Sequence, residues 1–171
     1  MSDGRDLRGR IISLRQDEVV LPTGVTVTLD VVHHPGAAAV VAVDDAGAVA
    51  LIHQFRHAAG GFIWEVPAGT LGPGEAPDAC ARRELREETG LVAARWTPLG
   101  HILTTPGFSD EVIYLYLARE LSEATAALDH DEVLTTSRVP LSRALAMIHG
   151  GEIADAKSIA ALCRAQAVLA A

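Results

Sequence analysis

Three glutamates, Glu84, Glu87 and Glu88, stand close together in the segment between Gly69 and Leu91. If this segment is helical, Glu84 and Glu88 lie on one face with Glu87 beside them, their Cβ atoms about 5–6 Å apart. Like charges at this spacing destabilise a helix, so a helix built only for stability would alternate its charges. Carboxylate oxygens suit Mg²⁺ or Mn²⁺ better than zinc. The spacing therefore predicts a divalent-cation site; the alternative is a solvated face on which neighbouring arginines pair with the glutamates.

The same segment carries the signals that would position these glutamates. It begins with a loop rich in glycine and proline, which neither a helix nor a strand would tolerate. Pro77 suits the first turn of a helix and Gly90 suits its C-terminal end. We therefore expect a helix of roughly Pro77 to Thr89, with Ala81 and Leu85 on the side that packs inward.

The segment resembles the signature of the Nudix hydrolases, G-x5-E-x7-R-E-U-x-E-E-x-G-U, in which U is a bulky aliphatic residue. The match is complete, and its fixed residues are Gly69, Glu75, Arg83, Glu84, Leu85, Glu87, Glu88, Gly90 and Leu91. The resemblance implies hydrolysis of a nucleoside diphosphate linked to another moiety, by metal-assisted attack of water on phosphorus. It implies Glu84, Glu87 and Glu88 as ligands of Mg²⁺, with Mn²⁺ as a substitute, and gives catalytic roles to Arg83 and Glu87.

A second region of resemblance follows the signature. Pro106 lies 15 residues beyond Leu91 and opens the run Pro-Gly-Phe-Ser-Asp-Glu. A proline at this distance in such a run is similar to the Nudix subgroup that acts on ADP-ribose. The resemblance implies substrate contacts for Pro106, Gly107 and Glu111, and the alternative is an ordinary loop between two strands.

A third region precedes the signature. The run Gln-Phe-Arg that ends at Arg56 closes an apolar stretch and resembles the QYR element of the same subgroup. The planar guanidinium of Arg56 suits a contact with phosphate or ribose oxygens, because it can bond two oxygens at once. The alternative is a surface arginine.

The residues that lead directly into the signature resemble the subgroup's E-[LI]-P-A-G run. By position, the resemblance implies that Glu65 contacts the adenine side of the substrate and that the backbone carbonyl of Ala68 ligates the metal. Phe62 and Trp64 are candidates for stacking on the base, and core packing is the alternative for both.

The general base is expected in an acidic run well after the signature. The subgroup has a glutamate there, in a D-E-D-E-U segment, and residues 129–133 of this chain read D-H-D-E-V. Glu132 is the best positional match. Because His130 departs from the pattern, Asp131 and Glu132 are hard to separate, and a solvated acidic turn is the alternative.

The elements that must position these residues are strands mixed with helices. The strand candidates are residues 8–14, 18–21, 25–32, 38–43, 48–55, 99–104, 112–118 and 132–139. We expect 38–43 and 48–55 to form a hairpin that is buried on two faces. The later helix candidates are Leu141–His149, capped by Ser142, and Asp155–Ala170, capped by Asp155.

This mixture predicts an α/β layered sandwich. The resemblance implies the Nudix fold, an α/β/α sandwich with a mixed sheet and an extra N-terminal antiparallel β-sheet. We expect residues 1–34 to form that extra sheet and residues 35–171 to form the Nudix hydrolase domain. In the subgroup the extra sheet is exchanged across a homodimer, so a homodimer is expected, with residues 1–34 contributing to dimerisation and to the substrate site.

Composition sets the outer limits. The chain has 171 residues and a net charge of −8, without a cluster of basic residues, which argues against a duplex nucleic-acid partner. Its longest apolar stretch is interrupted by Asp44 and Asp45, and its first residues have no apolar core, so neither a membrane span nor a signal peptide is expected. Cys80 and Cys163 are expected as free thiols, and the chain is predicted to be cytoplasmic.

The leading hypothesis is metal-dependent hydrolysis of the pyrophosphate bond of ADP-ribose to AMP and ribose 5-phosphate. One alternative is a Nudix hydrolase of another nucleoside diphosphate sugar, such as GDP-mannose or ADP-glucose. The other is a non-catalytic Nudix-like ligand sensor, against which the retained Glu84, Glu87 and Glu88 argue.

Overall fold

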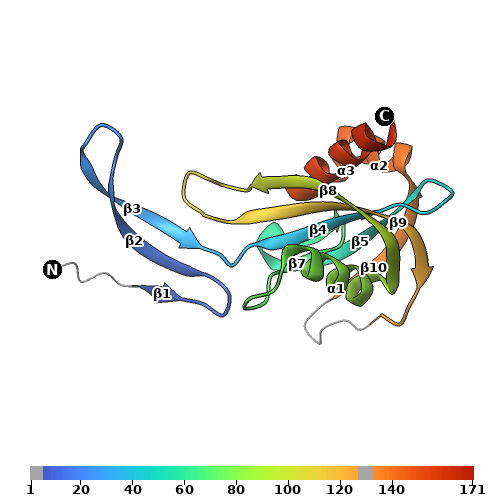
Figure 1. The fold of residues 1–171 in the computed structure, drawn as a ribbon, viewed down its shortest axis with the longest axis horizontal. Coiled ribbons are helices and arrows are strands. Elements are labelled where there is room, and N and C mark those ends of the chain that lie inside the picture. Colours follow the sequence, from blue (N-terminus) through green and yellow to red (C-terminus); the bar gives the residue numbers. More distant parts are fainter. Residues whose placement is uncertain (1–5, 127–132) are drawn as a thin grey trace.

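The computed structural model describes residues 6–126 and 133–171, which form three sheets and three α-helices (Figure 1). The strands are β1 (Leu7–Arg8), β2 (Ser13–Val20), β3 (Thr26–His33), β4 (Ala37–Ala42), β5 (Ala48–Arg56), β6 (Gly61–Glu65), β7 (Ala68–Thr70), β8 (Leu91–Leu103), β9 (Val112–Glu123) and β10 (Leu134–Pro140). The helices are α1 (Pro77–Thr89), α2 (Leu141–His149) and α3 (Ala156–Leu169), with a short 3₁₀ turn at His57–Ala59. The sheets have the orders β1-β2-β3, β10-β5-β6 and β7-β4-β9-β8.

Strand β4 lies at the centre of the sandwich and is buried along its whole length. Successive side chains of a strand point to opposite faces. Ala38 and Val40 accordingly belong to the apolar cluster that includes Leu85 of α1, whereas Val41 belongs to the cluster that includes Leu162 of α3. Because β4 pairs with β7 antiparallel and with β9 parallel, the sheet is mixed, and the expected α/β/α sandwich is confirmed.

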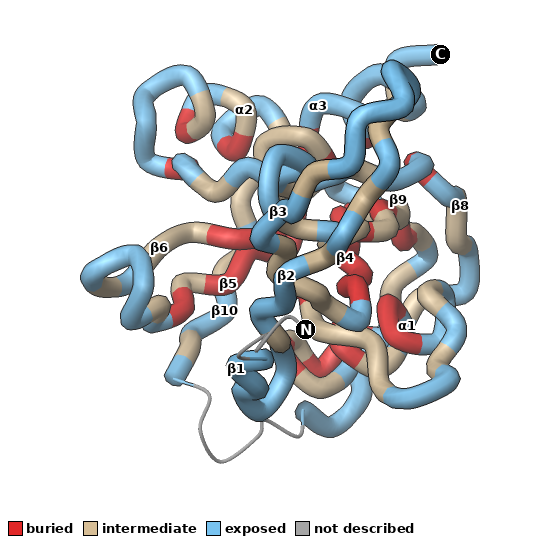
Figure 2. Tube along the Cα trace, turned by 90° about the vertical axis from the view of Figure 1, so that its left-hand side faces the viewer, coloured by how far each residue is buried: buried red, intermediate tan, exposed pale blue. Residues whose placement is uncertain are grey.

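The N-terminal strands form a separate antiparallel sheet that extends away from the sandwich (Figure 1). Most of its residues are exposed or half-buried (Figure 2). Val32 of β3 connects this sheet to the loop before β9. The N–H of Val32 donates to the Phe108 carbonyl (2.7 Å), and the Val32 carbonyl accepts from the Asp110 N–H (3.2 Å). The extra N-terminal antiparallel sheet is therefore confirmed.

The division of this sheet into strands at 8–14 and 18–21 is wrong. Strand β2 is continuous over Ser13–Val20, because β3 offers a partner for each of its residues, from Ser13 opposite His33 to Val20 opposite Thr26. The polar residues Gln16 and Asp17, which interrupt the apolar pattern, lie within this ladder. Cross-strand pairing therefore outweighs the local pattern here.

The expected hairpin of β4 and β5 is also wrong, although their burial is confirmed. A tight turn does join the two strands, with Asp44 Oδ1 accepting from the Ala48 N–H (2.8 Å). Only a single bridge, Val43 to Val49, connects them beyond that turn. β4 takes β7 and β9 as neighbours, while β5 takes β10 and β6. The two strands diverge because β4 pairs with two segments that are distant in the sequence, while β5 pairs with the adjacent β6 and the distant β10.

The C-terminal elements agree with expectation except in one cap. Helix α2 has the expected bounds, but Ser142 does not cap it: the N-cap is Pro140, without a side-chain hydrogen bond. Helix α3 is capped by Asp155, whose Oδ2 accepts from the Ser158 N–H (3.0 Å). The first residues of the predicted strand 132–139 fall partly outside the described range, and β10 begins at Leu134. Within 6–126 and 133–171, no helix is long and apolar enough to span a membrane.

Candidate active site

Helix α1 has the bounds that the sequence predicts and carries the signature glutamates. Ala81 and Leu85 are fully buried against the sheet, as expected. The helix ends at Gly90, whose left-handed backbone (φ 67°) directs its N–H to the Arg86 carbonyl at 2.9 Å. A side chain at this position would be strained and would also meet the Ala124 carbonyl oxygen at 3.0 Å. The local signals thus define where the helix that carries the glutamates begins and ends.

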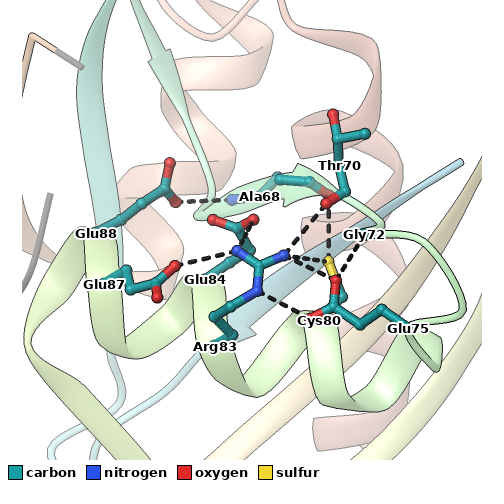
Figure 3. A network of polar contacts seen from close by, with 10 residues as sticks. Ala68, Thr70, Gly72, Glu75, Cys80, Arg83, Glu84, Glu87 and Glu88 are labelled. Carbon is teal, nitrogen blue, oxygen red and sulfur yellow. Dashed lines mark hydrogen bonds and ion pairs between the residues drawn. The ribbon is translucent and has the colours of Figure 1, made fainter. Parts of the chain in front are cut away.

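Arg83 is the centre of the polar network on this helix (Figure 3). Its guanidinium donates to Glu75 Oε1 (2.8 Å) and Oε2 (2.9 Å) in the preceding loop. It also donates to Glu84 Oε1 (2.6 Å) and Glu87 Oε2 (3.0 Å). These hydrogen bonds, that to Glu75 first, raise the pKa of Arg83 further above its usual range. Arg83 therefore joins the loop to the helix and orients two of the three signature glutamates.

The other contacts of the glutamates are with strand β7. Glu88 is 2% exposed, and its Oε2 accepts from the Ala68 N–H at 2.9 Å. Glu84 lies directly against the backbone of Gly69: a Cβ at that glycine would come within 1.8 Å of Glu84 Oε1. Gly69 is therefore required by close approach, and the carboxylates of Glu84 and Glu88 lie against β7 (Figure 3).

The predicted metal ligands make different contacts: Glu84 and Glu87 bond to Arg83, and Glu88 bonds to Ala68. As placed here, no group of three acidic, histidine or cysteine side chains among the described residues is arranged to hold a cation. Instead Arg83 stands between Glu84 and Glu87, because a cation between like charges removes their repulsion. The donors nevertheless fit a divalent cation in kind, since they are carboxylate oxygens, two of them on buried side chains, at a glycine that leaves room for Glu84.

Two neighbouring pockets open beside strand β7. The one that we call the glutamate pocket has a volume of about 350 Å³. Its lining residues are Arg10, Ile11, Gln54, Phe55, Arg56, Ala68, Gly69, Thr70, Arg83, Glu84 and Glu87. The other, the lysine pocket, has a volume of about 430 Å³ and includes Glu65, Thr104, Thr105, Glu111 and Lys157. Both pockets share Arg56 and the β7 residues Ala68, Gly69 and Thr70, so Arg56 stands at their junction.

Arg56 and Glu65 contact each other. Arg56 donates from Nε (3.0 Å) and Nη2 (2.8 Å) to Glu65 Oε2, while Glu65 itself is only 2% exposed. Arg56, whose side chain is 39% exposed, is therefore the more accessible member of the pair. The two residues predicted to stack on the base have different environments. Trp64 stacks on His53 (4.5 Å between ring centroids) and packs against the core, whereas Phe62 is exposed.

Of the predicted substrate contacts in and after the loop between β8 and β9, only one lines either of the two pockets. Glu111 lines the lysine pocket, together with Thr104 and Thr105. Pro106 and Gly107 are exposed, and neither lines the two pockets. Asp131 and Glu132, expected as the general base, lie outside the described residues.

Comparison with known proteins identifies the family. The profile of the NUDIX domain matches residues 32–162. The chain belongs to the Nudix family. Nudix hydrolases generally require a divalent metal ion, in keeping with the oxygen donors at α1 and β7.

Two relatives of this Nudix chain are named as ADP-ribose pyrophosphatases. It is 43% identical over 163 residues to the ADP-ribose pyrophosphatase of Mycobacterium tuberculosis, covering 94% of this chain and 79% of that protein. It is 42% identical over 156 residues to the ADP-ribose pyrophosphatase of Bacillus subtilis, covering 90% of this chain and 84% of that protein. A solved structure described as an ADP compounds hydrolase shares the fold, with a TM-score of 0.83, 20% identity, and coverage of 99% of this chain and 92% of that one.

Sequence reasoning missed residues of the Nudix chain that line the pockets. Lys157 contacts Glu65 and lines the lysine pocket, and Arg10 and Ile11 of the N-terminal region line the glutamate pocket. One signal for Lys157 is visible in the sequence: a cation in the first turn of a helix opposes the helix dipole. Nothing in the local sequence indicates that Arg10 and Ile11 reach the pocket.

The loop glutamate Glu75 supports a prediction about acid stability. Hydrogen bonds from Arg83, and then from the Gly72 N–H, lower the pKa of Glu75 from 4.5 to about 2. Such a carboxylate stabilises the fold above its unfolded pKa, and this stabilisation is lost as the pH falls through the folded pKa. We expect Glu75→Gln to lower Tm at pH 7 by roughly 2–8 °C, which corresponds to about 1–2 kcal/mol once solvent screening at Arg83 is allowed for.

Thermal unfolding across pH tests this prediction. The difference in Tm between wild type and Glu75→Gln should shrink as the pH falls from 4.5 to about 2. Glu123→Gln, at an exposed glutamate of β9, is the matched control and should change Tm little at any pH. A difference for Glu75→Gln that stays constant over this range would show that its charge does not stabilise the fold.

Proposed function

We propose that this chain hydrolyses the pyrophosphate bond of ADP-ribose to AMP and ribose 5-phosphate. The observation that carries the proposal is the pocket in which Arg56 lies with the signature residues Glu84, Glu87 and Arg83. The pocket belongs to a chain 42–43% identical to two ADP-ribose pyrophosphatases over at least nine tenths of its length. Membership of the Nudix family and these relatives make the chain a pyrophosphohydrolase.

Glu84, Glu87 and Glu88, with the backbone carbonyl of Ala68, are proposed to hold the metal ion. Mg²⁺ is the proposed ion and Mn²⁺ its substitute, because both prefer oxygen ligands. When bound, the metal neutralises charge on the pyrophosphate oxygens and lowers the pKa of a bound water.

The chain's own residues position this chemistry. The guanidinium of Arg83 holds Glu84 and Glu87 in place, and the Ala68 N–H holds Glu88. Arg56 is proposed to bind phosphate or ribose oxygens at the junction of the two pockets, with Glu65 fixing its orientation. Glu111 is proposed as a substrate contact in the lysine pocket. Pro106 and Gly107 keep their proposed substrate role only through the resemblance, since neither lines a pocket.

The general base is proposed to be Glu132 or Asp131. Val133, which follows them in the chain, supports this proposal. Its carbonyl accepts from the N–H of Phe55 at 3.0 Å, and Phe55 lines the glutamate pocket. The described residue nearest in sequence to the proposed base is thus bonded to the wall of the site.

Identification of the products tests the proposal. Incubation of ADP-ribose with the purified protein and Mg²⁺ should give equimolar AMP and ribose 5-phosphate by ³¹P NMR, with little conversion after the metal is removed with a chelator. Release of adenine or of inorganic phosphate as the first product would contradict pyrophosphate cleavage. Binding of ADP-ribose without turnover would favour the non-catalytic sensor.

A homodimer is proposed as the assembled form, with residues 1–34 as the exchanged sheet and residues 35–171 as the hydrolase domain. Large apolar side chains stand exposed on the N-terminal region, which is a common property of interaction surfaces. They are Leu7, Ile11, Ile12, Leu14, Val20, Val25 and Leu29. A cytoplasmic location also stays a prediction.

Sedimentation tests the dimer. The full chain should sediment at about twice its 18.0 kDa, and a variant that lacks residues 1–34 should be monomeric with much reduced activity. A stable and fully active monomer lacking these residues would contradict a role for the N-terminal sheet in the site.

A further inference from the structure

Lys157 occupies an unusual place in the fold. It lies in the first turn of α3, where a cation opposes the positive end of the helix dipole. Its ammonium donates to Asp155 Oδ2 (3.0 Å), in the N-cap of the same helix, and to Glu65 Oε1 (2.9 Å), which is 92 residues away in the sequence. Only 12% of its side chain is exposed. A residue that opposes a local preference in this way points to a role set by its distant partner.

That partner, Glu65, is a buried carboxylate shared between two cations. Its Oε1 accepts from Lys157, and its Oε2 accepts from Arg56. Only 3% of the Glu65 side chain is exposed. A buried carboxylate needs each of its oxygens bonded to remain in one orientation, because loss of one partner leaves charge that is not compensated. Lys157 therefore fixes the carboxylate on which the guanidinium of Arg56 rests.

The chain of contacts ends at the substrate side. Arg56 lines both pockets, and 39% of its side chain is exposed. A guanidinium binds oxygen pairs through a planar fork, so its contribution to binding depends on its orientation. An arginine resting on a single anchored carboxylate is pre-organised for such binding, whereas an arginine resting on a mobile one is not.

We propose that Lys157 is a positioning residue for substrate binding, which acts through buried Glu65 to hold Arg56 at the junction of the two pockets. This inference rests on the proposed function only for the identity of the substrate. It predicts that Lys157 and Arg56 act as one unit, so that removing either removes the same binding contribution.

A double-mutant cycle in steady-state kinetics tests the proposal. Lys157→Met should raise KM for ADP-ribose by about 10-fold and leave kcat within about threefold, as expected when binding rather than chemistry is weakened. Arg56→Gln should raise KM by at least as much. In the Arg56→Gln background, Lys157→Met should raise KM by less than about twofold further.

Arg143→Met is the matched control. It removes an exposed cation of α2 that pairs with Glu152 (2.9 Å) and lines neither pocket, so KM should stay within about twofold of the wild-type value. If Lys157→Met does not fold, Lys157→Gln replaces it, because glutamine keeps a hydrogen-bond donor for Glu65 but removes the charge.

Two results would overturn the proposal. A lower Tm with unchanged KM would show that Lys157 only stabilises the fold, and equal increases in KM in the wild-type and Arg56→Gln backgrounds would show that Lys157 acts independently of Arg56. A wild-type protein that does not hydrolyse ADP-ribose would defeat the proposed substrate instead. The cycle is then measured with the nucleoside diphosphate sugar that the wild type hydrolyses fastest.

Discussion

Gly69→Ala should reduce kcat by about 100-fold or more while the protein stays folded, because small displacements of catalytic groups can cost this much. The added Cβ would lie 1.8 Å from Glu84 Oε1 and 2.0 Å from its Cδ, so the two groups cannot occupy their present places together. The carboxylate is the end of a flexible side chain and moves more easily than the backbone of β7. One methyl group thus displaces a proposed metal ligand.

Activity and thermal stability measured on the same sample separate displacement from unfolding. Tm should change by only a few degrees, because Gly69 does not have a left-handed backbone conformation that would strain alanine. Gly61→Ala in β6 is the matched control, since a Cβ there meets no atom within 4 Å. If the Gly69→Ala protein had the wild-type kcat, Glu84 would not be a catalytically required metal ligand.

Glu88→Gln should reduce kcat by about 10³-fold at saturating Mg²⁺, which corresponds to about 4 kcal/mol of transition-state stabilisation. The amide oxygen of glutamine can still accept the hydrogen bond from the Ala68 N–H, so the shape of the site is retained. What is lost is the negative charge of a buried carboxylate, and with it the proposed contribution to holding the metal.

The control for charge removal lies on the same helix. Asp78→Asn removes an exposed carboxylate from the first turn of α1, at the opposite end from Glu88, and should leave kcat within about twofold. Titration with Mn²⁺, followed by the loss of its free-ion EPR signal, should show weaker binding to Glu88→Gln than to Asp78→Asn. Unchanged activity of Glu88→Gln at saturating Mg²⁺ would place the metal elsewhere.

The parts of the site that depend on local signals could be predicted from the sequence. Pro77, Gly90 and the apolar positions Ala81 and Leu85 are enough to define α1, and all four behave as expected. The strands were less predictable, because β4 and β5 read as a hairpin and yet belong to different sheets, β4 between β7 and β9 and β5 between β10 and β6. Turn residues indicate where a chain reverses, but the choice of neighbours in a sheet is decided by packing over the whole domain.

The contacts among charged residues were the least predictable. The resemblance gives Glu65 and Arg56 separate substrate contacts, and the sequence gives no reason to connect Glu65 with either Arg56 or Lys157. It also suggests that the signature glutamates gather together, whereas Arg83 stands between Glu84 and Glu87. Spacing along a helix shows which side chains share a face, but not which countercharge they meet.

The most direct test of the central claim is a comparison of kcat/KM for the wild-type protein with Mg²⁺ across a panel of substrates. The panel contains ADP-ribose, ADP-glucose, GDP-mannose and a diadenosine polyphosphate. The predicted result is that ADP-ribose exceeds each of the others by at least about 10-fold, a ratio that a few substrate-specific contacts can supply. If ADP-ribose is hydrolysed no faster than GDP-mannose or ADP-glucose, the assignment of this Nudix chain to ADP-ribose is contradicted.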